Sequence, residues 1–277
     1  MAVGDANRIN TNIGALNALN SLSDLNKALQ ISQLRLSTGR RINEAADDPA
    51  GYSIAVSFDK RARGLSVALD SVGTAGNALA IAEGALNNIN QIVLNMRDLV
   101  LQAASDTLAT AERNAINTQL SALRAEVDRI ASQTTFNGVQ LLDATFTDKR
   151  FQTGDTGTDY ISFSISSNFN STSVGLANVS VDTSAMASTS LASVNAAITI
   201  VSTQVQSIGS AVQRMRLIEN NLSVSIANIT ATKSRILDAD VAKEQVESTR
   251  LQIIRQLATA QLAQANVSPQ NVLSLFR

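Results

Sequence analysis

The chain lacks the side chains on which most enzyme chemistry depends. Its 277 residues include no cysteine and no histidine. Without cysteine there are no disulfides or thiolate nucleophiles, and without histidine the commonest general acid–base and metal-binding side chain is missing. Carboxylates or a serine–lysine pair could still act as catalysts, but no arrangement of such residues stands out. We therefore expect a protein that is not an enzyme and that uses no cofactor or metal.

Charge, proline and long apolar runs are also scarce. Charged residues make up 16% of the chain and the formal net charge is −1, so we expect neither nucleic acid nor a membrane as a partner. The chain contains no run of about 18 apolar residues, so we expect no transmembrane helix. We also expect no Sec-type signal peptide. Only Pro49 and Pro269 interrupt the chain, which leaves long stretches free to form helices.

Apolar residues near the start of the chain follow a helical spacing. They recur at steps of three and then four residues, which predicts a first helix with one apolar stripe. Gly39 is suited to end this helix, because glycine readily adopts the left-handed conformation that follows many helices. Asp48 before Pro49 is typical of an N-cap followed by the first helical residue, so a second helix should begin there.

The second helix carries an apolar residue at every seventh position, from Leu65 to Val100. A small or apolar residue three positions later completes the a and d pattern of a coiled coil. The seven-residue spacing returns between residues 194 and 236, after a shorter helix predicted around residues 116–130. We expect the two heptad-bearing helices to pair, so that the N- and C-terminal parts of the chain form long antiparallel helices.

The middle of the chain has a different composition. No lysine or arginine occurs between Phe151 and Gln213, and serine and threonine are frequent. Residues 160–166 alternate apolar and polar side chains, which predicts a strand. Its hairpin partner is predicted at residues 149–152, and residues 179–181 are predicted as a further short strand. The fold class is therefore mainly α, with a small β-hairpin region in the middle, at about residues 137–185.

The C-terminal segment has more apolar surface than one helix pair can cover. One stripe contains Val246, Ile253 and Leu257, and an adjacent stripe contains Leu251 and Ile254. A two-helix hairpin buries only one of them, and exposed apolar area of this size indicates a partner surface. We therefore predict that both ends of the chain contact other copies. The predicted assembly interface consists of Ile13, Leu16, Leu19, Leu22, Leu25, Leu29, Leu251, Ile254, Leu257, Leu262, Leu273, Leu275 and Phe276.

The two ends of the chain resemble the bacterial flagellins. The motifs that carry the resemblance are RINTN at residues 8–12, LSTGRRINEAADDPAG at 36–51, QTTFNGVQLL at 133–142 and LAQANVSPQNVLSLFR at 262–277. The resemblance implies a structural subunit of the flagellar filament that self-assembles by its terminal helices into a helical tubular polymer. Residues 1–45 and 237–277 would then form an inner coiled-coil domain, and residues 46–236 an outer helical-bundle domain.

The same resemblance implies a set of partners and a location. Besides other copies of the chain, these are a flagellar export chaperone, the type III export apparatus, the filament cap protein and the hook–filament junction proteins. The protein would be secreted and would end in the extracellular filament. Two alternatives are a hook–filament junction protein, which has similar ends, and a coiled-coil adaptor that does not polymerise.

Overall fold

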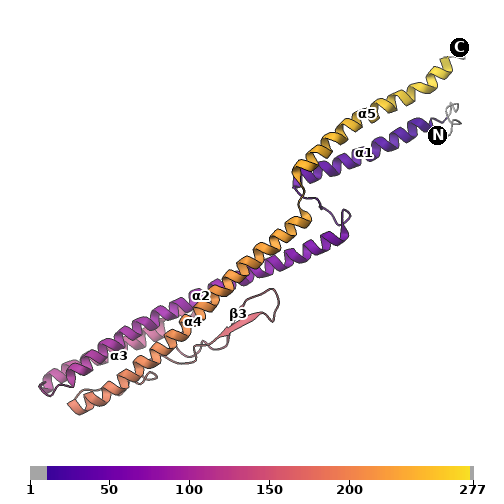
Figure 1. Cartoon of the computed structure of the whole chain (residues 1–277). Coiled ribbons are helices and arrows are strands. Elements are labelled where there is room, and N and C mark those ends of the chain that lie inside the picture. The colour runs from indigo at the N-terminus through magenta and orange to yellow at the C-terminus, as the bar shows by residue number, and fades with distance from the viewer. Residues whose placement is uncertain (1–10, 275–277) are drawn as a thin grey trace. The chain divides into compact units, whose positions relative to one another are not determined.

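The computed structural model describes residues 11–274, with side chains up to residue 267, and this part of the chain is mainly helical (Figure 1). The helices are α1 (Ile13–Thr38), α2 (Pro49–Ala103), α3 (Thr110–Gln133), α4 (Ser184–Leu237) and α5 (Val241–Ser274). The strands are β1 (Thr135–Phe136), β2 (Val139–Gln140), β3 (Lys149–Gln152) and β4 (Tyr160–Phe163). The predicted fold class is confirmed, and α2 begins at Pro49 as its sequence indicated.

The chain separates into two compact units. The terminal unit comprises the chain up to Lys60 and from Ile229 onward, and the central unit comprises Arg61–Asn228. Helices α2 and α4 each contribute residues to both units. The domain limits predicted from the sequence, 1–45 with 237–277 and 46–236, stay a prediction.

In the terminal unit, α1 and α5 lie side by side and antiparallel (Figure 1). The amide of Asn12, the N-cap of α1, donates a hydrogen bond of 2.7 Å to the Ala265 carbonyl, and near the other end of α1 the Ser32 hydroxyl lies 3.5 Å from the Glu244 carbonyl. Gly39 ends α1 in the left-handed conformation, with a φ of 68°. The Ala239 N–H donates a hydrogen bond of 2.9 Å to the Gly39 carbonyl. This bond joins the α1–α2 connection to the α4–α5 connection.

The central unit has its core along the heptad positions of α2 and α4. The residues of α2 at seven-residue spacing from Leu65 to Val100 are at most 6% exposed, and Val194, Val201 and Ile208 of α4 are fully buried. Arg97, near the end of α2, donates to Asn195, near the start of α4, at 3.1 Å. The two helices are therefore antiparallel here, as predicted.

By composition alone, α2 and α4 would be taken for membrane-crossing helices. Both contain an 18-residue window with a mean hydropathy of 1.3, which is apolar enough for a membrane-crossing helix. In the central unit, however, their apolar residues at heptad spacing are buried within the protein. The interhelical core therefore takes up the residues at heptad spacing, which form only part of each apolar window: 39% of the α2 window and 28% of the α4 window is buried.

The end of α2 is closed by a side chain from the next helix. Arg113 of α3 is 6% exposed, and its guanidinium donates hydrogen bonds to the carbonyls of Ala103 and Ser105. The last carbonyls of a helix have no partner within the helix. A buried cation there donates hydrogen bonds to them and interacts favourably with the negative end of the helix dipole.

Two small hairpins follow α3. Strands β1 and β2 are joined by Asn137 and Gly138, whose φ angles of 49° and 77° give the turn that two-residue hairpins favour. Strands β3 and β4 pair antiparallel, with Arg150 opposite Ser162, which confirms the predicted hairpin. Its second strand ends at Phe163 and not at residue 166 as predicted.

The prediction of a further strand at residues 179–181 is wrong. Val179 and Val181 are buried, but this segment forms no strand. Side chains of α3 bind the backbone of the segment instead: the Arg124 guanidinium donates to the Ala177 carbonyl at 2.6 Å, and the Asn117 side-chain carbonyl accepts from the Val181 N–H at 2.9 Å. These bonds satisfy backbone groups that a sheet would otherwise pair.

Candidate assembly surface

The inner seam of the terminal unit joins one face of α1 to one face of α5. Leu29 of α1 and Leu251 of α5 are 3% and 8% exposed, and they lie in this seam with the buried Ser32 and Ser248. The predicted interface residues Ile13, Leu22, Leu25, Ile254 and Leu262 are half-buried. The seam therefore takes up the α5 stripe that contains Leu251 and Ile254.

The second stripe of α5 stays uncovered by the described chain. Leu257 is 60% exposed, Ile253 54% and Val246 69%, while on α1 Leu16 and Leu19 are 53% and 51% exposed. A helix pair cannot cover both stripes, and the structure buries one and leaves the other open. We call this set, which consists of Leu16, Leu19, Val246, Ile253 and Leu257, the outer stripe.

Part of the outer stripe was absent from the predicted interface. The sequence places Val246 and Ile253 in one stripe with Leu257, but of these three the predicted interface includes only Leu257. The seven-residue spacing from Val246 to Ile253 is the sequence signal by which both residues could have been assigned to the interface. Leu273 belongs to α5, but its side chain lies outside the described residues, as do Leu275 and Phe276.

Comparison with known proteins assigns the chain to a family. Residues 9–147 match the family described as bacterial flagellin N-terminal helical region, and residues 191–276 match the one described as bacterial flagellin C-terminal helical region. The chain belongs to the bacterial flagellin family. These two matches include the stretches in which α1, α3 and α5 lie.

Relatives extend this similarity over the whole flagellin chain. A flagellin of Bacillus subtilis (strain 168) is 36% identical, with 98% of this chain and 100% of the relative covered. The flagellar filament 33 kDa core protein of Treponema phagedenis is 31% identical, with 97% and 99% covered. A solved structure described as a flagellar hook-associated protein from Vibrio parahaemolyticus covers 69% of this chain and 100% of its own, with a TM-score of 0.56 and 15% identity. That last likeness concerns the fold alone.

Charge is sparse on the α1–α5 pair of this flagellin. The ion pairs on it join residues of the same helix, Lys27 with Asp24 at 3.6 Å and Arg250 with Glu247 at 3.1 Å. From Gln256 to Val267 no residue is charged. This uncharged part of α5 can meet a copy of itself without like-charge repulsion, and apolar burial drives such an association.

The connection between α1 and α2 is held by a carboxylate. Asp47 accepts hydrogen bonds from the backbone N–H groups of Asn43 and Glu44, at 2.9 and 3.2 Å. These bonds, together with the nearby charge of Arg35, hold the pKa of the Asp47 carboxyl below its usual value of 3.8. The connection therefore has a defined geometry that depends on an ionised side chain.

Proposed function

We propose that this flagellin is the structural subunit of a bacterial flagellar filament and that it self-assembles by its terminal helices into a helical tubular polymer, the propeller of motility. The observation that carries the proposal is the outer stripe of α1 and α5. In a protein of a structural family, exposed large apolar side chains of this kind are suited to contacts between copies.

The predicted interface residues have different parts in this proposal. Leu16, Leu19 and Leu257 are exposed enough to contact a neighbouring copy directly. Leu29 and Leu251, which are buried in the seam, hold α1 against α5 and so shape the surface that the outer stripe presents. The proposed inner domain, residues 1–45 with 237–277, contains both sets.

The finer partners follow from the family and are part of the proposal. The subunit leaves the cell through the type III export apparatus, after a cytoplasmic export chaperone has bound its C-terminal segment. It joins the filament beneath the cap protein, in a polymer that starts at the hook–filament junction proteins. The uncharged run after Arg255, with its exposed apolar residues, supports chaperone binding, because such a surface would otherwise associate before export.

Assembly of the purified chain is the direct test. The full chain, desalted and concentrated, should form long uniform filaments by electron microscopy. Variants that lack residues 1–36 or 256–277 should stay soluble and partly helical by circular dichroism but should not polymerise. Normal filaments from either truncated chain would refute assembly through the terminal helices. A full chain that forms only short or discrete oligomers would instead have the behaviour of a junction protein or an adaptor.

A further inference from the structure

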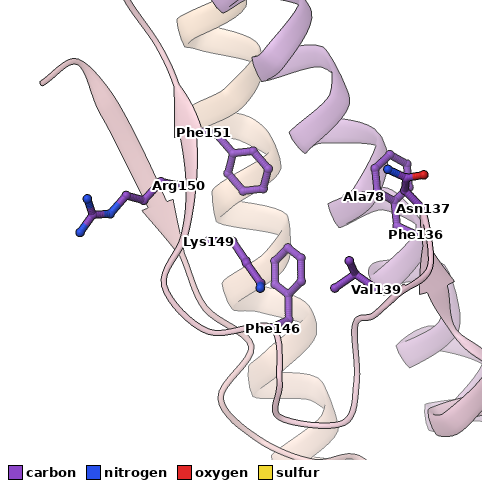
Figure 2. Close-up of a pocket in the computed structure, with 8 residues that line it drawn as sticks. All are labelled: Ala78, Phe136, Asn137, Val139, Phe146, Lys149, Arg150 and Phe151. Atoms are coloured by element: carbon purple, nitrogen blue, oxygen red, sulfur yellow. The ribbon is translucent and has the colours of Figure 1, made fainter. Parts of the chain in front are cut away.

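The central unit contains a small hollow that filament assembly through the terminal helices does not use. It lies between the β1–β2 hairpin, strand β3 and α2, and has a volume of about 220 Å³. Figure 2 shows Phe146, Lys149 and Phe151 on one side of it, and Phe136, Asn137 and Val139 on the other, with open space between. We call it the hairpin pocket.

The wall of the hairpin pocket is aromatic. Phe146 is 5% exposed, and its ring centroid lies 6.5 Å from that of Phe151 at an interplanar angle of 32°. Phe136 and Val139 face these rings across the hollow (Figure 2). An apolar cavity of about 150 Å³ holds one benzene ring, so the hairpin pocket has room for one ring with a short substituent.

One cation stands at this wall without a counterion. Lys149 is half-buried, and in the described part of the chain its side chain makes no ion pair or hydrogen bond. Its neighbour Arg150 points away from the pocket (Figure 2), pairs with Asp148 at 3.8 Å and stacks on the Tyr160 ring at 4.6 Å. The alternation of side chains along β3 explains this difference, since Lys149 and Phe151 share one face and Arg150 the other.

The pocket thus combines apolar walls with one uncompensated positive charge. Among the described residues that line it, none is acidic. We propose that the hairpin pocket binds a small aromatic monocarboxylate. The ring of this ligand lies between Phe136 on one side and Phe146 and Phe151 on the other, and its carboxylate accepts a hydrogen bond from the Lys149 ammonium. A charge-assisted hydrogen bond from a half-buried lysine favours an anion over a neutral ligand of the same shape, and the hollow has room for a single ring.

The test compares a charged and a neutral ligand of one shape. Binding of 4-fluorophenylacetate and of 4-fluorophenylacetamide to the full chain is measured by ¹⁹F NMR titration. We expect the acid to bind about tenfold more tightly than the amide, the factor that a charge-assisted hydrogen bond supplies. Lys149→Met should reduce this preference to within about twofold. The matched variant Lys27→Met, which removes a positive charge from an exposed site on α1, should leave the preference unchanged.

Several results would overturn the proposal. One is equal binding of acid and amide, and another is an unchanged preference in Lys149→Met. Val139→Trp should fill the pocket and weaken both ligands, so undiminished binding in this variant would place the ligand elsewhere. Thermal melts of each variant separate these results from misfolding.

Discussion

Leu257 and Leu251 lie six residues apart on α5, and truncating them should affect different properties, the assembly in one case and the stability of the monomer in the other. Leu257 is 60% exposed and Leu251 is 8% exposed. Fully burying a leucine side chain contributes about 1.5–3 kcal/mol, so covering the exposed part of Leu257 in a filament contributes about 1–2 kcal/mol. Leu257→Ala should therefore raise the critical concentration for polymerisation by a factor of about 5–30 and leave the monomer as stable as before.

Leu251→Ala acts within the monomer. Replacing a buried leucine by alanine costs about 2–5 kcal/mol, and the low end applies here because only two helices surround the site. Circular dichroism of this variant should show loss of helix from the terminal unit at a lower temperature than in the wild type. Its polymerisation should also weaken, since the surface that the outer stripe presents depends on the seam.

The assay combines sedimentation of polymer with thermal melts of the monomer. Gln252→Ala is the control, because it changes an exposed side chain of α5 without removing apolar area, and its critical concentration should equal that of the wild type. If Leu257→Ala polymerises at the wild-type concentration, the outer stripe does not contact other copies. If Leu251→Ala leaves the melt unchanged, the seam does not hold α1 to α5.

Three further changes test the rest of the structure. Arg113→Met should lower the free energy of unfolding by about 2–3 kcal/mol, because the carbonyls at the end of α2 lose a charged donor; a loss below about 0.5 kcal/mol in chemical denaturation would contradict the capping role. Gly64→Ala places a methyl group 2.8 Å from the Cβ of Asp155, so hydrogen exchange in β3 and β4 should accelerate, and Asp155→Gly should restore it. The lowered pKa of Asp47 means that its carboxylate stabilises the fold above the usual value of 3.8 and that this contribution is lost as the pH falls through the lowered pKa. Asp47→Asn should therefore lower the melting temperature at pH 7, and this effect should shrink as the pH is lowered below 3.8; an effect that does not change with pH would refute the assignment.

The long helices could be predicted because their signals are local and repeated. Six residues stand at steps of seven from Leu65 to Val100, and each of them is buried. The ends of helices were equally accessible, since Pro49 and Gly39 each restrict the backbone in one known way. The β3–β4 hairpin followed from period-two alternation beside a glycine-containing turn.

The segment after β4 was harder to predict, for a physical reason. Ile165, Phe169, Leu176 and Val181 are fully buried, yet no regular period relates them. Polar side chains of α3 hold parts of this segment. Asp128, for example, accepts from both the N–H and the hydroxyl of Ser171, at 2.7 and 2.9 Å. Such bonds join residues more than 40 positions apart, and a serine-rich stretch by itself does not indicate where its partners lie.

The outer stripe shows what a stripe of leucines does and does not imply. Half-buried Ala15 and Ala18 of α1, rather than Leu16 and Leu19, face the inner seam, and half-buried Ala258 and Ala265 do so on α5. Small residues let two helices approach closely, but they bury little area and so hold the pair weakly. At this end of the pair, Leu16 and Leu19 are thereby left for surfaces outside it, whereas Leu29 and Leu251 bury their side chains in the seam farther along. A helix pair that places alanines inside and leucines outside over part of its length contributes less to the isolated hairpin there and more to an assembly, which suits a polymerising subunit.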